Sequence, residues 1–331
     1  MPTWLAWFAV AFTLAATQSQ VPAFRTSTDV VIVDVQVTSG SGDVISDLTQ
    51  ADFMLKVDGK PRPILTFIHE RIDDARPAKR AGVGAMSTLS SGIRIDAQSY
   101  VMVVVDPWMM RPEASRNLLD QAADFVEKLP AAHAVGLTLL PARRPQYPFT
   151  TNRAPIVAAL RKQLGALGAG TTPTTSEGQA AIDGIEAAID DLRDVDGRKT
   201  MVFIADVMTD PSGRLRQIAT RAADANITIH TISTDATVAS LVDVKKRTPT
   251  DLPGLADTGS GSMLSDLTGG WSLRRATNGS LVMSRIEKML AEQYVLTFAL
   301  TADDRDGKSH QIEVSVNRPG AQVRARSSFV R

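Results

Sequence analysis

Residues 100–105 read Y-V-M-V-V-V, a continuous apolar run without polar alternation. A strand of this kind is buried on both faces, as happens when helices cover both sides of a mainly parallel sheet. Apolar residues at helical spacing follow from Leu118 to Leu129, and Pro130 ends the pattern. Together these segments predict the first strand and helix of an α/β domain.

The same alternation continues along the chain and predicts a domain over residues 99–292. Further buried strands are predicted at 134–140, 199–205 and 227–232, and helices at 154–164, 177–192, 215–225 and 281–292. This order is typical of an α/β fold with a doubly wound, mainly parallel sheet. We expect the Gly- and Ser-rich stretch D-T-G-S-G-S-M at 257–263 to be a flexible loop.

Both flanks of this domain carry the period-two pattern of half-buried strands. The predicted strands are 30–37, 53–57 and 64–68 before it, and 294–300, 311–316 and 323–330 after it. We expect the N-terminal β unit at 21–70 and the C-terminal strands at 293–331 to join into one β-sandwich. Residues 71–98 combine Pro, Gly, Ser and scattered charges without any period, which predicts a linker.

The N-terminal segment has the pattern of an export signal. Residues 4–16 read W-L-A-W-F-A-V-A-F-T-L-A-A, an apolar run too short to span a bilayer but of the length of a signal-peptide core. We therefore expect a signal peptide at 1–20 and an exported protein, periplasmic or extracellular. The alternative is an uncleaved anchor, which would be the chain's only link to a membrane.

Composition excludes several classes of function. Lys plus Arg and Asp plus Glu each number 36, so the chain has no net charge with which to collect nucleic acid. It has no Cys and only four His, which leaves little for disulfides, thiol catalysis or zinc. The motifs G-x-S-x-G, G-x-G-x-x-G after a strand and H-E-x-x-H are also absent, so we do not expect an enzyme.

Two acidic residues follow predicted buried strands and are the main candidates for a site. Asp106 follows the first of these strands, and Asp206 follows the strand at 199–205. Ligands of open α/β sheets bind beyond the carboxyl ends of the strands. Thr171 and Thr172, in a Gly-rich loop before a predicted helix, could add oxygen ligands for a hard cation. The alternative is that both carboxylates cap the N-termini of neighbouring helices.

Several motifs resemble a known family. They are F-R-T-x-T-D-V-V-I-V-D-V-x-V at 24–37, D-L-T-x-x-D-F at 47–53, L-x-D-L-T-G-G at 264–270 and E-V-S-V-N-R-P-G at 313–320. With the strands that end in Asp and the Gly-Thr loop, they resemble the VWFA-related protein family of acidobacteria. The resemblance covers nearly the whole chain after the signal peptide. It implies that the α/β domain is a von Willebrand factor type A domain.

The resemblance also implies a place for a metal. Domains of this type commonly hold Mg²⁺ in a metal-ion-dependent adhesion site, made of D-x-S-x-S, a Thr and a further Asp, and a carboxylate of the partner completes the shell. By position, Asp106 is the first Asp, Thr171 or Thr172 is the Thr, and Asp206 is the last Asp.

The two serine positions of that motif are occupied here by Trp108 and Met110. An indole offers only an N–H donor and a thioether is a weak, soft acceptor, so neither replaces a hydroxyl around Mg²⁺. The sequence therefore predicts a degenerate metal site, with no cofactor or at most weakly bound Mg²⁺.

We expect this protein to be an exported protein-binding or adhesion module. Its partner is an unidentified protein, and Trp108, Met109 and Met110 are expected to form an exposed apolar patch beside Thr171 and Thr172. The alternative for the three apolar residues is that they lie buried under a loop. The alternatives for function are an exported, phosphatase-like hydrolase that uses Asp106 and Asp206, and a structural component of the cell envelope.

Overall fold

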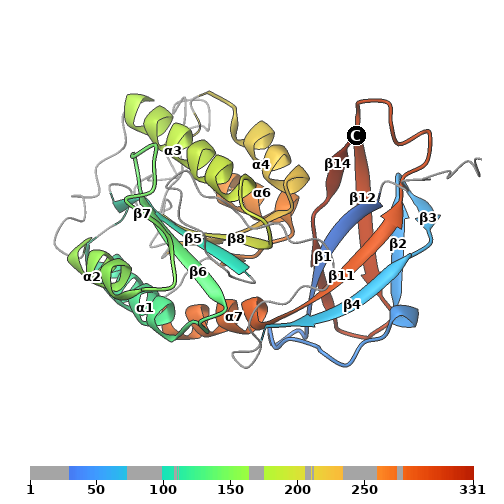
Figure 1. The fold of residues 1–331 in the computed structure, drawn as a ribbon, viewed down its shortest axis with the longest axis horizontal. Helices are drawn as coiled ribbons and strands as arrows, with labels where there is room; N and C mark the ends of the chain where they lie inside the picture. The colour runs from blue at the N-terminus through green and yellow to red at the C-terminus, as the bar shows by residue number, and fades with distance from the viewer. Residues whose placement is uncertain are drawn as a thin grey trace, which may run out of the picture.

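The computed structural model describes residues 30–72, 99–107, 110, 112–163, 175–205, 210, 212–233, 259–273 and 279–331. The chain forms an α/β module, a six-stranded sheet with helices on both faces, and a β module of two four-stranded antiparallel sheets (Figure 1). The expected mixed α/β fold with a mostly parallel sheet is confirmed. The signal peptide predicted at 1–20, and 73–98 of the predicted linker, lie outside the described residues.

The sheet of the α/β module is parallel except at one edge. Its strand order is β10-β9-β8-β5-β6-β7, and only β7 runs antiparallel to its neighbour. The strands are β5 (Ser99–Val105), β6 (His133–Leu139), β7 (Tyr147–Thr150), β8 (Arg198–Ile204), β9 (Ile227–Ile232) and β10 (Ser272–Leu273). β7 and β10 were not predicted, because strands this short carry little apolar pattern.

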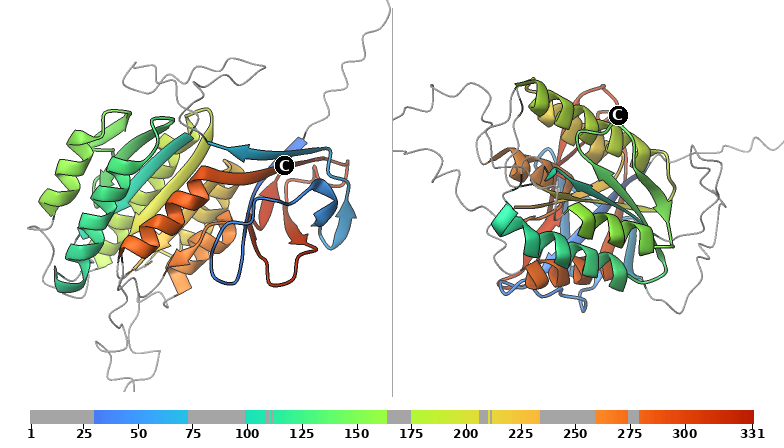
Figure 2. Two further views of the ribbon diagram at one scale, coloured as in Figure 1. Left: turned by 90° about the horizontal axis from the view of Figure 1, so that it is seen from below. Right: turned by 90° about the vertical axis from the view of Figure 1, so that its left-hand side faces the viewer.

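Helices cover both faces of this sheet, as the two views in Figure 2 show. They are α1 (Pro112–Lys128), α2 (Ala154–Gln163), α3 (Thr175–Arg193), α4 (Leu215–Asp224), α6 (Gly259–Thr268) and α7 (Gly279–Ala291). On one face, α1, α2 and α7 pack against Val101, Val103 and Val105 of β5. On the other, α3, α4 and α6 pack against Met102 and Val104. Because successive residues of a strand point to opposite faces, this explains why β5 is apolar throughout.

The β module combines strands from both ends of the chain. One sheet has the order β13-β1-β11-β4 and the other β14-β12-β2-β3. The strands are β1 (Val30–Thr38), β2 (Phe53–Val57), β3 (Lys60–Arg62), β4 (Thr66–Arg71), β11 (Glu292–Ala299), β12 (Ser309–Val316), β13 (Gln322–Ala325) and β14 (Ser328–Val330), with a short 3-10 helix at Gln50–Asp52. The two sheets share one apolar core, which includes Val33, Leu55, Leu296 and Phe329.

Some predicted elements differ in the structure. The strand expected at 64–68 is β4, which begins at Thr66, whereas β3 was not predicted, and the strand expected at 323–330 is two strands, β13 and β14, which belong to different sheets. The loop expected at 257–263 is also wrong, since α6 begins at Gly259. Its Gly and Ser residues hide the helical pattern, but Leu264 is fully buried in the core and stabilises the helix there.

The two modules meet at the end of α7, where one buried arginine and one buried glutamine bond to the helix. Arg198, at the start of β8, donates to the carbonyl oxygens of Leu290 at 2.6 Å and Met289 at 2.7 Å, in the last turn of α7. Gln36 of β1 donates to the same Met289 oxygen at 2.9 Å. These donors satisfy carbonyl groups that the end of a helix leaves unpaired. Because α7 passes directly into β11, the contacts fix the β module against the sheet.

Candidate functional site

The carboxyl ends of β5 and β8 form the edge that sequence analysis singled out. The two strands are parallel neighbours, with Val105 opposite Ile204. From β5 the chain moves outward to β6 and β7 on one side, and to β8, β9 and β10 on the other. The strand order therefore reverses between β5 and β8, which is where open α/β sheets place their ligands.

Asp106 lies at this edge and is held by the backbone. It is 5% exposed, and its N–H donates to the carbonyl oxygen of Ile204 at 3.0 Å. Next to it, the N–H of Ala205 donates to Ile232 at 3.1 Å. These bonds continue the ladder past the ends of the strands, so the start of each following loop has a fixed position.

The apolar patch predicted here has to be corrected at one residue. Met110 is fully buried in the core beneath α1, so it is not exposed as expected. Burial of its side chain removes apolar surface from water, which is the favourable arrangement for a thioether side chain. The other predicted site residues lie outside the described part of the chain: Trp108, Met109, Thr171, Thr172 and Asp206.

The segment after β6 approaches the same edge and is held by α3. Arg143 donates to Oδ2 of Asp183 on α3 at 2.5 Å. The neighbouring Gly184 permits this approach, because a Cβ there would lie 2.5 Å from Leu140 and 2.9 Å from the carbonyl oxygen of Ala142. A side chain at this position would push the segment away from the helix.

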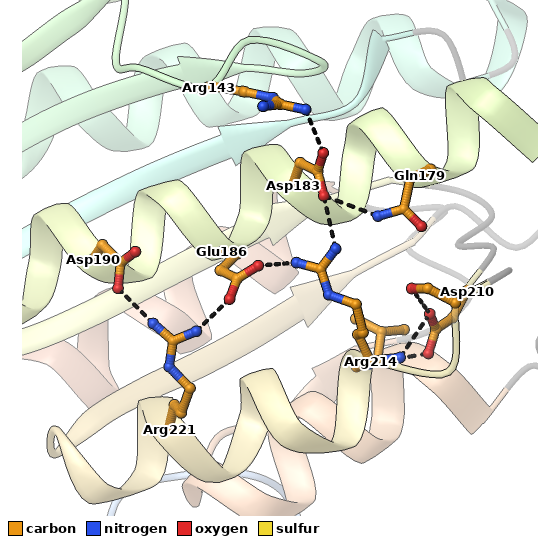
Figure 3. Close-up of polar contacts among 10 residues, drawn as sticks. Arg143, Gln179, Asp183, Glu186, Asp190, Asp210, Arg214 and Arg221 are labelled. Carbon is orange, nitrogen blue, oxygen red and sulfur yellow. Dashed lines mark hydrogen bonds and ion pairs between the residues drawn. The ribbon is translucent and has the colours of Figure 1, made fainter.

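A ladder of ion pairs connects α3 with α4 (Figure 3). Arg214 donates to Asp183 at 2.9 Å and also bonds Glu186, while Arg221 bonds Glu186 and reaches Asp190 at 2.8 Å. A hydrogen bond from Gln179, followed by those from Arg214, holds the pKa of Asp183 below its usual value. The sequence pattern did not predict this ladder. Its only signals were the spacing of the acidic residues on α3 and the seven-residue spacing between Arg214, the N-cap of α4, and Arg221.

The end of the segment after β8 is fixed at the start of α4. Asp210 accepts hydrogen bonds from the backbone N–H groups of Arg214 at 3.1 Å and Leu215 at 2.9 Å, and from the Ser212 hydroxyl at 3.0 Å. Such bonds satisfy N–H groups that the first turn of a helix leaves unpaired. The segment after β6 and the segment after β8 are therefore positioned by polar contacts with α3 and with the start of α4.

Met110 does not fit a tight Mg²⁺ site at this edge. Met110, at one of the two hydroxyl positions of the family motif, directs its side chain into the apolar core. A magnesium ion needs near-octahedral oxygen ligands, and a thioether cannot supply one. Within the described ranges, no three His, Asp or Glu side chains come together as they would around a metal ion.

Comparison with known proteins identifies no family. No family model matches this chain, and no curated protein matches it. Within the described ranges, moreover, none of the helices is both long enough and apolar enough to cross a membrane.

Among solved structures, the matches are distant. The human COPII-coat protein Sec24c is 10% identical, with a TM-score of 0.36, over 71% of this chain and 44% of that one. Proximal thread matrix protein 1 from the mussel byssus is 13% identical, with a TM-score of 0.39, over 60% of this chain and 47% of that one. The chain therefore corresponds to less than half of either protein.

Proposed function

We propose that this chain is an exported, von Willebrand A-like module that binds a protein through the edge beyond β5 and β8. The observation that carries the proposal is the adjacency of these two strands at the point where the strand order reverses. Asp106 follows one strand and Asp206 follows the other. The family resemblance of the sequence motifs supports the same assignment.

The strand order supports the type of fold. Counted within the α/β module, β5 is the first strand and β10 the sixth, so the observed order corresponds to 3-2-1-4-5-6. This is an order of doubly wound α/β sheets, which bind ligands at their reversal point. The helices on both faces agree with it.

We propose binding and not catalysis, and binding that does not depend on a tightly held metal. With Met110 in the core and Asp106 buried, we assign the partner contact to Trp108, Met109, Thr171 and Thr172, which lie outside the described residues. Aromatic side chains that become buried at an interface supply much of its binding energy. Trp108 is therefore the residue expected to contribute most to the partner contact.

Photochemical crosslinking tests this assignment. Trp108 is replaced by p-benzoylphenylalanine in the full chain, and Arg318 is replaced in the same way as a matched control in the β module, where its side chain bonds Asp47. Illumination of cells that produce each variant should give a discrete crosslinked protein several-fold more strongly from position 108. Equal crosslinking from both positions, or crosslinking only from position 318, would contradict binding at this edge.

A further inference from the structure

His310 lies between two carboxylates at the far end of the β module. Its Nδ1 lies 2.8 Å from Oδ2 of Asp58, and its Nε2 lies 3.1 Å from Oδ1 of Asp306. A carboxylate only accepts hydrogen bonds, so both contacts are hydrogen bonds at once when the ring is the charged imidazolium and both of its nitrogens donate. The residue as a whole is only 7% exposed.

These groups connect segments that are far apart in the sequence. Asp58 belongs to the β2–β3 turn and also accepts the N–H of Gln311 at 2.8 Å. Asp306 belongs to the loop between β11 and β12. In β14, Phe329 lies directly opposite His310, with the two rings stacked at 5.3 Å between centroids. The imidazolium therefore holds a turn, a loop and a terminal strand at one point.

β14 in turn contacts the α/β module. The N–H of Val330 donates to Oδ1 of Asp224, in the last turn of α4, at 3.0 Å. On its other side, Phe329 is fully buried against Phe298, with ring centroids 5.6 Å apart. A strand of three residues has few backbone bonds of its own, so its position depends on such contacts.

We propose that Asp58, His310 and Asp306 form a pH-sensitive clasp that holds β14 in place between the two modules. A neutral imidazole has one N–H donor, so one ring nitrogen would present a lone pair to a carboxylate. That contact is repulsive and one of the two bonds is lost. Release of the β2–β3 turn or of the loop at Asp306 then loosens the strand that packs on His310.

The charged groups around His310 favour its protonated form, as the clasp requires. The hydrogen bond to Asp58 raises the pKa of His310 above 6.5, burial opposes the shift, and Asp306 adds to it. The other charged groups near the clasp are Arg62, Asp304, Lys308 and Arg331. Because the folded-state pKa is raised, the clasp is closed below about pH 6.5 and opens as the pH rises through the folded-state value.

Histidine NMR and amide hydrogen exchange test the clasp on the full chain. The chain has only four His, so the ring signal of His310 can be followed through its titration. Exchange is measured on the amides of β14 and corrected for the intrinsic effect of pH. We expect their protection to fall by about tenfold or more across that titration, the scale of one lost charge-assisted hydrogen bond.

Two variants sharpen the test. His310→Gln should remove the pH dependence of β14 exchange, because Gln does not titrate. His69→Gln is the matched control, since His69 also faces a carboxylate, Glu292 at 3.1 Å, and stacks on an aromatic ring, but lies in the other sheet. It should leave the exchange of β14 unchanged. Constant protection of β14 in the wild-type chain, while the His310 ring titrates, would overturn the proposal without reference to either variant.

Discussion

Gly270→Ala should lower the free energy of unfolding by about 3 kcal/mol or more, because no space exists for a methyl group. A Cβ at this position would lie 1.9 Å from the carbonyl oxygen of Ile229 and 2.5 Å from its carbonyl carbon. Both are backbone atoms of the buried strand β9, so no side-chain rotation relieves the overlap. Either the strand or the turn after α6 has to move.

The surroundings of Gly270 explain why movement is costly. Thr268 accepts the N–H of Ile229 at 3.0 Å through its hydroxyl, which ties the end of α6 to the same strand. Gly269 has a φ of +78°, and a Cβ there would lie 2.5 Å from the carbonyl carbon of Ala325. The motif D-L-T-G-G at 266–270 is thus the joint at which α6, β9 and the C-terminal strands meet.

Urea unfolding of the full chain measures this effect. Gly40→Ala is the matched control, because its Cβ would meet nothing within 4 Å, and it should change stability by less than about 1 kcal/mol. If Gly270→Ala were as stable as Gly40→Ala, the close approach of this turn to β9 would be wrong.

Acidification below pH 6.5 should destabilise the protein through two buried histidines, by up to about 1.4 kcal/mol per pH unit for each. His133 and His230 are fully buried. Burial, with the charge of Arg198 and for His133 also that of Arg153, lowers the pKa of each to about 3. Between 6.5 and 3 the unfolded chain therefore binds protons that the folded chain does not. The free energy of unfolding then rises with pH across this window.

Protonation of either ring would be unfavourable, because within the described ranges the charged imidazolium would lack hydrogen-bond acceptors. Nδ1 of His230 accepts the N–H of Trp271 at 3.2 Å, and its Nε2 has no hydrogen-bond partner among the described residues. Both nitrogens of His133 are likewise buried without a partner in the described part of the chain. An added charge would remain unpaired in an apolar setting, which is why the folded state resists protonation.

The slope of stability against pH between 6 and 5 is the quantity to measure. His133→Gln should reduce this slope, because the buried ring that resists protonation is then absent. Three half-buried carboxylates act with the opposite sign, since partial burial raises the pKa of Asp34, Asp191 and Asp224. The carboxylates contribute equally to the slopes of variant and wild type, so their contribution cancels when the two slopes are subtracted. An unchanged slope in His133→Gln would show that the buried ring does not remain neutral.

The sheet of the α/β module was predictable because its strands are long and buried on both faces. β5 and β8 stand out as apolar runs, and parallel neighbours end at the same edge, so Asp106 could be placed from sequence. α6 could not be predicted from sequence, because this helix depends on burial of Leu264 in the core and not on local helix propensity.

Side-chain contacts between distant segments could not be predicted from the sequence pattern. Whether Met110 faces solvent or the core depends on the path of the chain after β5, which no periodicity fixes. His310 meets Asp58 only because β12 pairs with β2, although the two residues are far apart in the chain. The same holds for the ladder of ion pairs, whose two rows lie on separate helices.

Calorimetric titration of the full chain with Mg²⁺ measures whether the edge beyond β5 and β8 holds a cation tightly, which the proposed mode of partner binding does not require. With Trp108 and Met110 at the hydroxyl positions, we expect no uptake in the micromolar range, and the same trace from Asp106→Ala. Micromolar binding by the wild-type chain that disappears in Asp106→Ala would contradict this, and would show that the edge is a working metal site.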